Sequence, residues 1–211
     1  MGIYRQLRCY RRRSAQACLK LLDSSMTPER RKTVLAALNS RSIKKAWEAG
    51  QSIWADPDPA LLRGVVWTMR RGRSQHNRVE AAYRLRTMPG TTGIATCERI
   101  LKDKKASKQL RAHVAETLAN RHRPASHDVL LRTLKSESSP EMRFWCAFAL
   151  GFIQERRALP TLRRLAETDH RVVKGWWRVS KEARDAIGRI EHPDAISKVK
   201  RPRRCIFCRP R

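Results

Sequence analysis

The chain has 211 residues and 41% of them are hydrophobic, so it is long enough and apolar enough to bury a core and is not a disordered tail. Lys and Arg number 47 against 19 Asp and Glu, a formal net charge of +28. A folded chain with this charge repels itself unless a polyanion neutralises it; nucleic acid carries closely spaced phosphates, and an anionic membrane surface would also attract it. No apolar run approaches the roughly 18 residues of a spanning helix, so no membrane span is expected.

Residues 1–26 are predicted to form a basic N-terminal segment, helical over residues 1–22. This segment lacks an apolar stretch followed by a small-residue cleavage site, so it does not look like a secretory signal. Its Arg-rich and acid-poor composition leaves an organellar transit peptide open. Its candidate phosphate-binding residues, all before the first acidic residue, are Arg5, Arg8, Arg11, Arg12 and Arg13.

Residues 27–192 are predicted to form short helices joined by short turns. Ala, Leu, Arg, Lys and Glu dominate, alternating β-branched runs are nearly absent, and apolar residues recur at helical spacing in segments of about 10–14 residues. Turn-forming residues separate the segments, in chain order, at 56–59, 89–90, 124, 138–140 and 192–193.

These helices repeat. The octets 78–85, 111–118 and 143–150 each begin with Arg and have Ala four residues later and Leu three residues beyond that. Their starts are 33 and 32 residues apart, and Leu101, Leu134 and Leu165 in the preceding helices keep nearly the same period. A last copy at 183–190 is offset by an insertion around 174–178. A fixed period of this length is typical of a solenoid.

Residues 137–151, with the sequence ESSPEMRFWCAFALG, resemble the HEAT-like repeat pattern D-p-s-p-x-V-R-x-x-A-a-x-A-L-G of the PBS-lyase type. The resemblance is best over 126–190, fair over 76–125 and loose before that. It implies an all-α fold, a right-handed α-solenoid (α-α superhelix) of about five HEAT-like helix pairs over residues 27–192. In this family the second helices line the concave face, which would therefore hold Arg78, Arg84, Arg111, Arg121, Arg143 and Arg184.

Two further groups of cations add to this predicted binding surface. Arg70, Arg71 and Arg73 cluster around a Gly-containing turn, and the tail at residues 193–211 contributes Arg201, Arg203 and Arg204. Arg outnumbers Lys at these positions, which suits bidentate contacts with phosphate.

Four of the six tryptophans have predictable positions. Trp67 and Trp145 lie inside apolar helical patterns and are predicted to be core residues. Trp176 and Trp177 cannot both face inward on a helix, because neighbours differ by about 100°. One of them is therefore expected at the surface, where Lys174 and Arg178 flank the pair and a base or a protein partner could pack on it. The group Lys174, Trp176, Trp177 and Arg178 completes the candidate interface.

The six cysteines do not indicate a disulfide scaffold. Cys18, Cys97 and Cys146 lie in apolar helical patterns and are expected to be small core residues. Cys205 and Cys208 form a C-x-x-C pair, which is half of a zinc site or a redox motif, but no matching pair completes it. No cofactor and no metal are expected, with zinc at this pair as the open alternative.

Three functions fit the sequence. The preferred prediction is a non-catalytic scaffold that grips the phosphate backbone of DNA or RNA, within the cytoplasm in a nucleoid- or ribonucleoprotein-associated state or within an organelle. The resemblance also implies a second candidate, because some HEAT-like proteins are alkylpurine DNA glycosylases that use a groove lined by Trp and Arg. The carboxylate of such an enzyme would be Asp58, Glu80, Glu116 or Asp185. The third candidate is an adaptor for an acidic protein partner.

Overall fold

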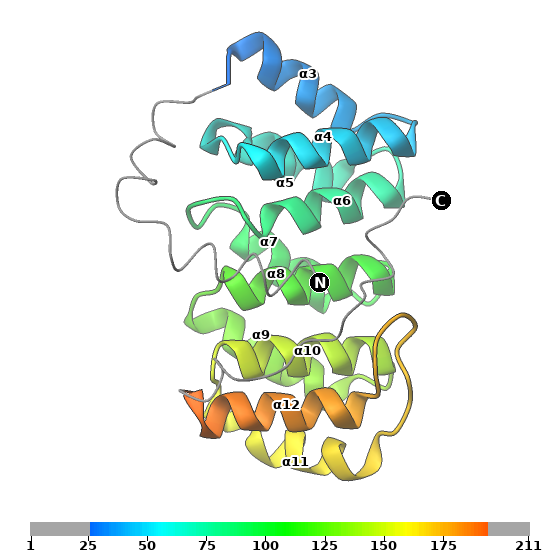
Figure 1. The fold of residues 1–211 in the computed structure, drawn as a ribbon, viewed down its shortest axis with the longest axis vertical. Coiled ribbons are helices and arrows are strands. Elements are labelled where there is room, and N and C mark those ends of the chain that lie inside the picture. Colours follow the sequence, from blue (N-terminus) through cyan, green and yellow to red (C-terminus); the bar gives the residue numbers. More distant parts are fainter. Residues whose placement is uncertain (1–25, 194–211) are drawn as a thin grey trace.

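The computed structural model describes residues 26–193, and the predicted segments 1–26 and 193–211 lie almost entirely outside them. Within the described residues the chain is all helical and forms an α-solenoid of five helix pairs (Figure 1). The pairs are α3 (Pro28–Leu38) with α4 (Ile43–Ala55), α5 (Leu62–Arg71) with α6 (Gln75–Leu85), α7 (Ile94–Lys102) with α8 (Lys108–Asn120), α9 (Pro124–Ser136) with α10 (Pro140–Phe152), and α11 (Leu159–Thr168) with α12 (Val179–Glu191). Short 3₁₀ turns at Pro59–Leu61 and Arg156–Ala158 precede α5 and α11.

The helices begin where the sequence supplies a cap. The side-chain oxygens of Thr27, Ser42 and Ser107 each accept a hydrogen bond from the backbone amide three residues later, at the starts of α3, α4 and α8. Pro occupies the first turn of α3, α9 and α10, where its missing N–H costs no helical hydrogen bond. The residues in the turns therefore determine where each helix begins and, with it, the period of the repeat.

The second helices α4, α6, α8, α10 and α12 stack on one another and form one layer, with the first helices behind them in the view of Figure 1. The repeated Leu85, Leu118 and Leu150 are buried in this layer. The repeated alanines are fully buried as well, which allows close backbone approach. At Gly151 an added Cβ would lie 2.6 Å from the Cα of Ala186, so the glycine that ends the Ala-Leu-Gly motif lets α10 and α12 touch.

Two predictions about tryptophan are wrong. Trp67 is 54% exposed, because the buried stripe of α5 runs through Leu62, Val65 and Met69, and a residue two positions after Val65 points about 200° away from it. Trp145 is buried, as predicted.

Trp176 and Trp177 are both half-buried, so neither is the expected surface residue. They lie in the turn before α12 rather than in a helix, and Gly175 has a φ of 79° there. A β-bridge between Val172 and Arg178 closes this turn. The 100° rule for helices does not apply to such a turn, and both rings pack against Phe144, with centroids 5.7 and 5.8 Å away.

Candidate nucleic-acid interface

Each repeated octet has an arginine at its first or second position, and this arginine has a structural role. The guanidinium groups of Arg78, Arg111 and Arg184 donate to the carbonyls of Met69, Leu101 and Ala166, at 3.2, 3.0 and 2.9 Å. Arg143 donates in the same way to the carbonyl of Glu137, at 2.6 Å, just after α9. The last carbonyls of a helix lack intrahelical partners, and these arginines satisfy one such carbonyl at the end of each preceding first helix.

Two of these arginines also join successive repeats. Arg111 forms an ion pair with Glu137, and Arg143 forms one with Asp169 at 2.9 Å, each carboxylate lying in the turn of the next helix pair. We call Arg111–Glu137 and Arg143–Asp169 the arginine ladder. Hydrogen bonds from Arg171, together with Arg143, lower the pKa of Asp169 to about 2, so this carboxylate is anionic.

The structure does not present Arg84, Arg111 and Arg121 on a concave wall, because all three side chains are buried. Arg84 pairs with Glu80 at 2.5 Å. Arg121 donates to four carbonyls between residues 85 and 92, at 2.6 to 2.9 Å, and holds the connection from α6 to α7. These arginines serve the fold and are not accessible to a phosphate backbone.

The carboxylates proposed for a glycosylase are likewise bound to cations. Asp58 contacts Arg31 at 2.7 Å, Glu80 pairs with Arg84, and Asp185 contacts Lys181 at 2.8 Å. Glu116 pairs with Arg86 inside the protein. Burial alone would raise the pKa of Asp58 and of Glu116, but Arg31 and Arg86 outweigh it and lower both pKa values.

The interior holds many of the negative charges. Among the described residues seven Asp and Glu are buried, and each forms an ion pair with Arg: Asp58, Glu80, Glu98, Glu116, Glu155, Asp169 and Glu182. Because each of these carboxylates is neutralised by an arginine, the net positive charge is carried by the remaining Lys and Arg.

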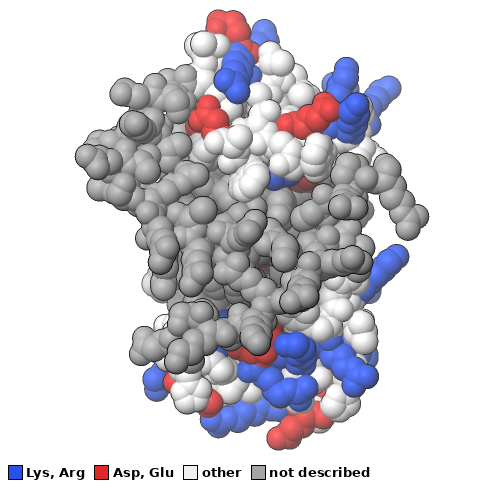
Figure 2. All heavy atoms as spheres, in the orientation of Figure 1, with Lys and Arg blue, Asp and Glu red and all other residues white. Residues whose placement is uncertain are grey.

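About half of the exposed cations of the described residues lie along one edge of the solenoid. The turns that join the two helices of each pair lie above one another on the right-hand side of Figure 1, and Lys and Arg project from that side near α4 and near the α11–α12 turn in Figure 2. We call this the basic turn edge. Its exposed cations are Arg41, Lys44, Lys45, Arg70, Arg71, Arg73, Lys102, Lys104, Lys105, Lys108, Lys135, Lys174 and Arg178.

Little negative charge opposes this edge. Among the described residues, the Lys and Arg that form ion pairs are not those of the basic turn edge. Of the carboxylates in the same turns, Glu137 and Asp169 are bound within the arginine ladder, which leaves Asp103 exposed. The edge therefore combines a regular spacing with cations that face solvent.

The predicted Arg70, Arg71, Arg73, Lys174 and Arg178 lie on this edge, whereas sequence reasoning missed its other lysines and Arg41. A signal was present, because cations recur after each first helix with the period of the repeat. The remaining predicted residues Arg5, Arg8, Arg11, Arg12, Arg13, Arg201, Arg203 and Arg204, and the Cys205–Cys208 pair, lie outside the described residues.

Trp176 and Trp177 belong to the packed end of the solenoid. The Trp177 indole N–H donates to Glu182 at 3.0 Å, and the Lys181 ammonium lies 5.1 Å from the centre of its ring. The Trp176 ring packs edge-on against Trp145, with centroids 5.1 Å apart. Their aromatic faces are largely used by the protein itself.

The described residues contain no cluster of three or more His, Cys, Asp or Glu that could hold a metal ion. Cys97 and Cys146 are buried free thiols, and burial raises the pKa of Cys97 to about 12. None of the helices in residues 26–193 has the length and hydropathy required to cross a bilayer.

Comparison with known proteins agrees with the fold. A family model of HEAT repeats matches residues 95–179, which run from α7 to the start of α12. No curated protein matches the chain. The matched segment contains both ion pairs of the arginine ladder, the helix pairs α7–α8 and α9–α10, and helix α11. The match over residues 95–179, together with the stacked helix pairs, therefore supports a HEAT-repeat protein.

Proposed function

We propose that the chain is a non-catalytic scaffold that binds the phosphate backbone of nucleic acid along the basic turn edge. The observation that carries this proposal is the recurrence of exposed cations at the turn of every helix pair, without bound carboxylates beside most of them. A nucleic-acid backbone is a linear array of charges, and a linear row of Lys and Arg can neutralise several of them at once.

The identity of the cations supports backbone binding without base reading. Lysines dominate the middle of the edge at α7 and α8, and a Lys ammonium binds phosphate as a point charge without selecting a base. We therefore expect strong binding with little sequence preference.

The test is binding of the purified, nuclease-treated protein to duplex DNA, single-stranded DNA and structured RNA across a salt series. Submicromolar affinity with a steep negative slope of log affinity against log salt is expected. Weak binding that does not change with salt would refute the proposal. The order of the three ligands would show which nucleic acid the edge prefers.

A pair of matched variants tests whether nucleic acid binds at the basic turn edge. Replacing Lys102, Lys104 and Lys105 with Gln removes three cations from the basic turn edge, and replacing Arg63, Arg156 and Arg164 with Gln removes three exposed cations elsewhere. The first variant should lower the salt slope by about one unit for each lost phosphate contact, and the second should leave it unchanged. Equal effects would assign binding to overall charge rather than to the edge.

One observation favours the adaptor as a second candidate. Ile43, Trp47 and Trp54 are exposed at 64%, 41% and 41%, and their spacing places them on one side of α4. Exposed apolar groups of this size favour a protein contact. Binding of an acidic protein that persists in high salt and is lost on replacing Trp47 and Trp54 with Ala would support this candidate over the first.

A further inference from the structure

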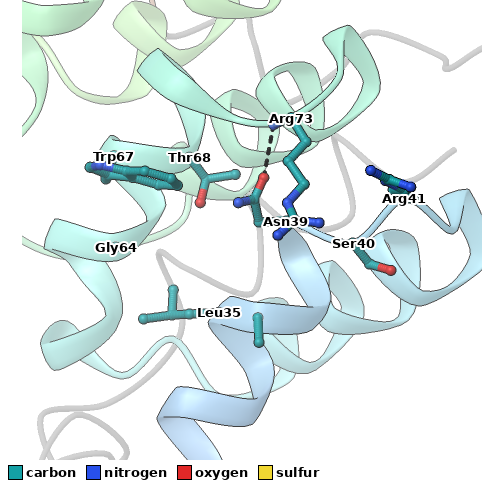
Figure 3. Close-up of a pocket in the computed structure, with 9 residues that line it drawn as sticks. Leu35, Asn39, Ser40, Arg41, Gly64, Trp67, Thr68 and Arg73 are labelled. Carbon is teal, nitrogen blue, oxygen red and sulfur yellow. Dashed lines mark hydrogen bonds between the residues drawn. The ribbon is translucent and has the colours of Figure 1, made fainter.

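A groove lies beside the basic turn edge, between the first helices of the first two pairs. It has a volume of about 630 Å³, which is in the range of small-ligand sites. Figure 3 shows Trp67 of α5 on one side and the side chains of Arg41 and Arg73 on the other, with Thr68 and Asn39 between them and Leu35 of α3 below. We call it the Trp67 groove.

The chemistry of the groove is aromatic and cationic. Trp67 is 54% exposed, although Trp is among the most costly side chains to leave in water. Arg41 and Arg73 are both exposed, and the described residues that line the groove include no Asp or Glu. A flat apolar ring beside two guanidinium groups suits a ligand that combines a π-face with a phosphate.

The groove is held in shape by buried polar contacts. The Asn77 side-chain amide, which is fully buried, donates to the carbonyls of Leu38 and Ser40 at 2.8 and 2.9 Å. The side-chain oxygen of Asn39 accepts from the backbone N–H of Arg73 at 2.9 Å (Figure 3). These bonds fix the backbone of the two turns that carry Arg41 and Arg73, so both residues are placed beside Trp67 before any ligand arrives.

We infer that the Trp67 groove binds an unpaired base of single-stranded nucleic acid, with the base stacked on Trp67 and the adjoining phosphate held by Arg41 and Arg73. This inference rests on the proposed function, because Arg41 and Arg73 are also part of the basic turn edge. A base within a duplex has both faces stacked and cannot reach the ring, so the groove selects single strands or loops.

The test compares two single-stranded oligonucleotides of equal length and charge, one normal and one with abasic sites throughout. Both carry the same phosphates, so their affinity ratio measures base contacts alone. The wild-type protein should bind the normal strand about tenfold more tightly, because stacking on one aromatic side chain contributes about that factor. Equal affinity for the two strands would overturn the inference and leave the proposed function standing, whereas binding to neither would refute both.

Variants locate the effect. Trp67→Ala should abolish the preference for the normal strand and leave the abasic affinity unchanged, Trp67→Phe should retain part of it, and Trp54→Ala should behave as wild type. Because both replaced side chains, Trp67 and Trp54, are exposed, unchanged thermal unfolding will confirm that each variant folds. Retention of the preference in Trp67→Ala, or its loss in Trp54→Ala, would overturn the assignment.

The double variant Arg41→Gln, Arg73→Gln tests the phosphate partner. It should weaken binding of the normal and the abasic strand alike, since both carry the phosphate, and the affinity ratio should stay near its wild-type value. Adenosine monophosphate should compete far more weakly than a strand, because it makes no contact with the rest of the edge. Competition by the free nucleotide at the concentration of the strand would make this a nucleotide site instead and overturn the inference.

Discussion

The first two helix pairs and the last three share a period but are joined by different chemistry. Between the last three pairs the arginine ladder spans each junction, with Arg111 bound to Glu137 and Arg143 bound to Asp169. Between the first two pairs the corresponding turns are joined by neutral side chains, Asn39 and Asn77. The same stacking can thus be held by ion pairs or by amides.

This difference changes what the surface offers. In the first two pairs Trp47, Trp54 and Trp67 are exposed, whereas in the last pairs Trp145 is buried and Trp176 and Trp177 pack against Phe144. The last helix pairs pack their tryptophan rings against the protein itself, whereas the first two pairs leave theirs exposed and available for binding. Binding surfaces are therefore expected at the first two pairs, where the HEAT pattern is loosest.

The largest expected effect separates two arginines at equivalent positions. Arg111→Met removes a buried partner of Glu137 and a donor to the carbonyl of Leu101, and should lower the free energy of unfolding by about 3 kcal/mol. Arg78→Met removes only the bond to the carbonyl of Met69 and should cost about 1 kcal/mol. Urea titration of both variants measures this. Equal losses would mean that the ladder pair adds nothing to stability.

A glycine pair tests how tightly the last repeats are stacked. Gly151→Ala drives a Cβ to 2.6 Å from the Cα of Ala186 and should destabilise the protein by about 1–3 kcal/mol, because backbone cannot move aside as a side chain can. Gly188→Ala meets nothing within 4 Å and should stabilise α12 by about 0.5–1 kcal/mol. Thermal unfolding distinguishes them, and a stable Gly151→Ala variant would contradict the close α10–α12 contact.

Acid should weaken the last repeats. Hydrogen bonds from Arg157 lower the pKa of Glu155 from 4.5 to about 2, and those from Arg171 and Arg143 lower that of Asp169 from 3.8 to about 2. A lowered pKa in the folded state stabilises the protein above the unfolded pKa, and this contribution is lost as the pH falls from about 4.5 towards 2. The melting temperature should fall through this window, and Asp169→Asn should be less stable at pH 6 and show a shallower decline. If the melting temperatures of wild type and variant fall in parallel as the pH is lowered, the ionised Asp169 carboxylate does not stabilise the protein.

The smallest effect leaves stability nearly unchanged and concerns solvent access. Acrylamide should quench part of the native tryptophan fluorescence readily, because Trp47, Trp54 and Trp67 are exposed. Replacing these three with Phe should leave emission that acrylamide quenches poorly. If the triple variant is quenched as easily as wild type, the tryptophans of the last repeats are also open to solvent.

The local sequence determined the helices and their order. The turn residues and the period of Arg, Ala and Leu are local signals that predicted a helical solenoid, and the resemblance to HEAT repeats implied about five pairs, as the structure has them. The buried Ala and Leu of each octet followed from the same pattern, because one face of each second helix must meet its neighbour.

The tertiary structure decided which charged side chains and which tryptophans are buried and which face solvent. Nothing local distinguishes Arg121, which is buried against four carbonyls, from Arg73, which faces solvent, because each depends on which turn lies beside it after stacking. The helical pattern also could not show that Trp67 lies off the buried stripe or that Trp176 lies in a turn. Only stacking brings the separate turns into one row, and so only the tertiary structure reveals the basic turn edge and the Trp67 groove beside it.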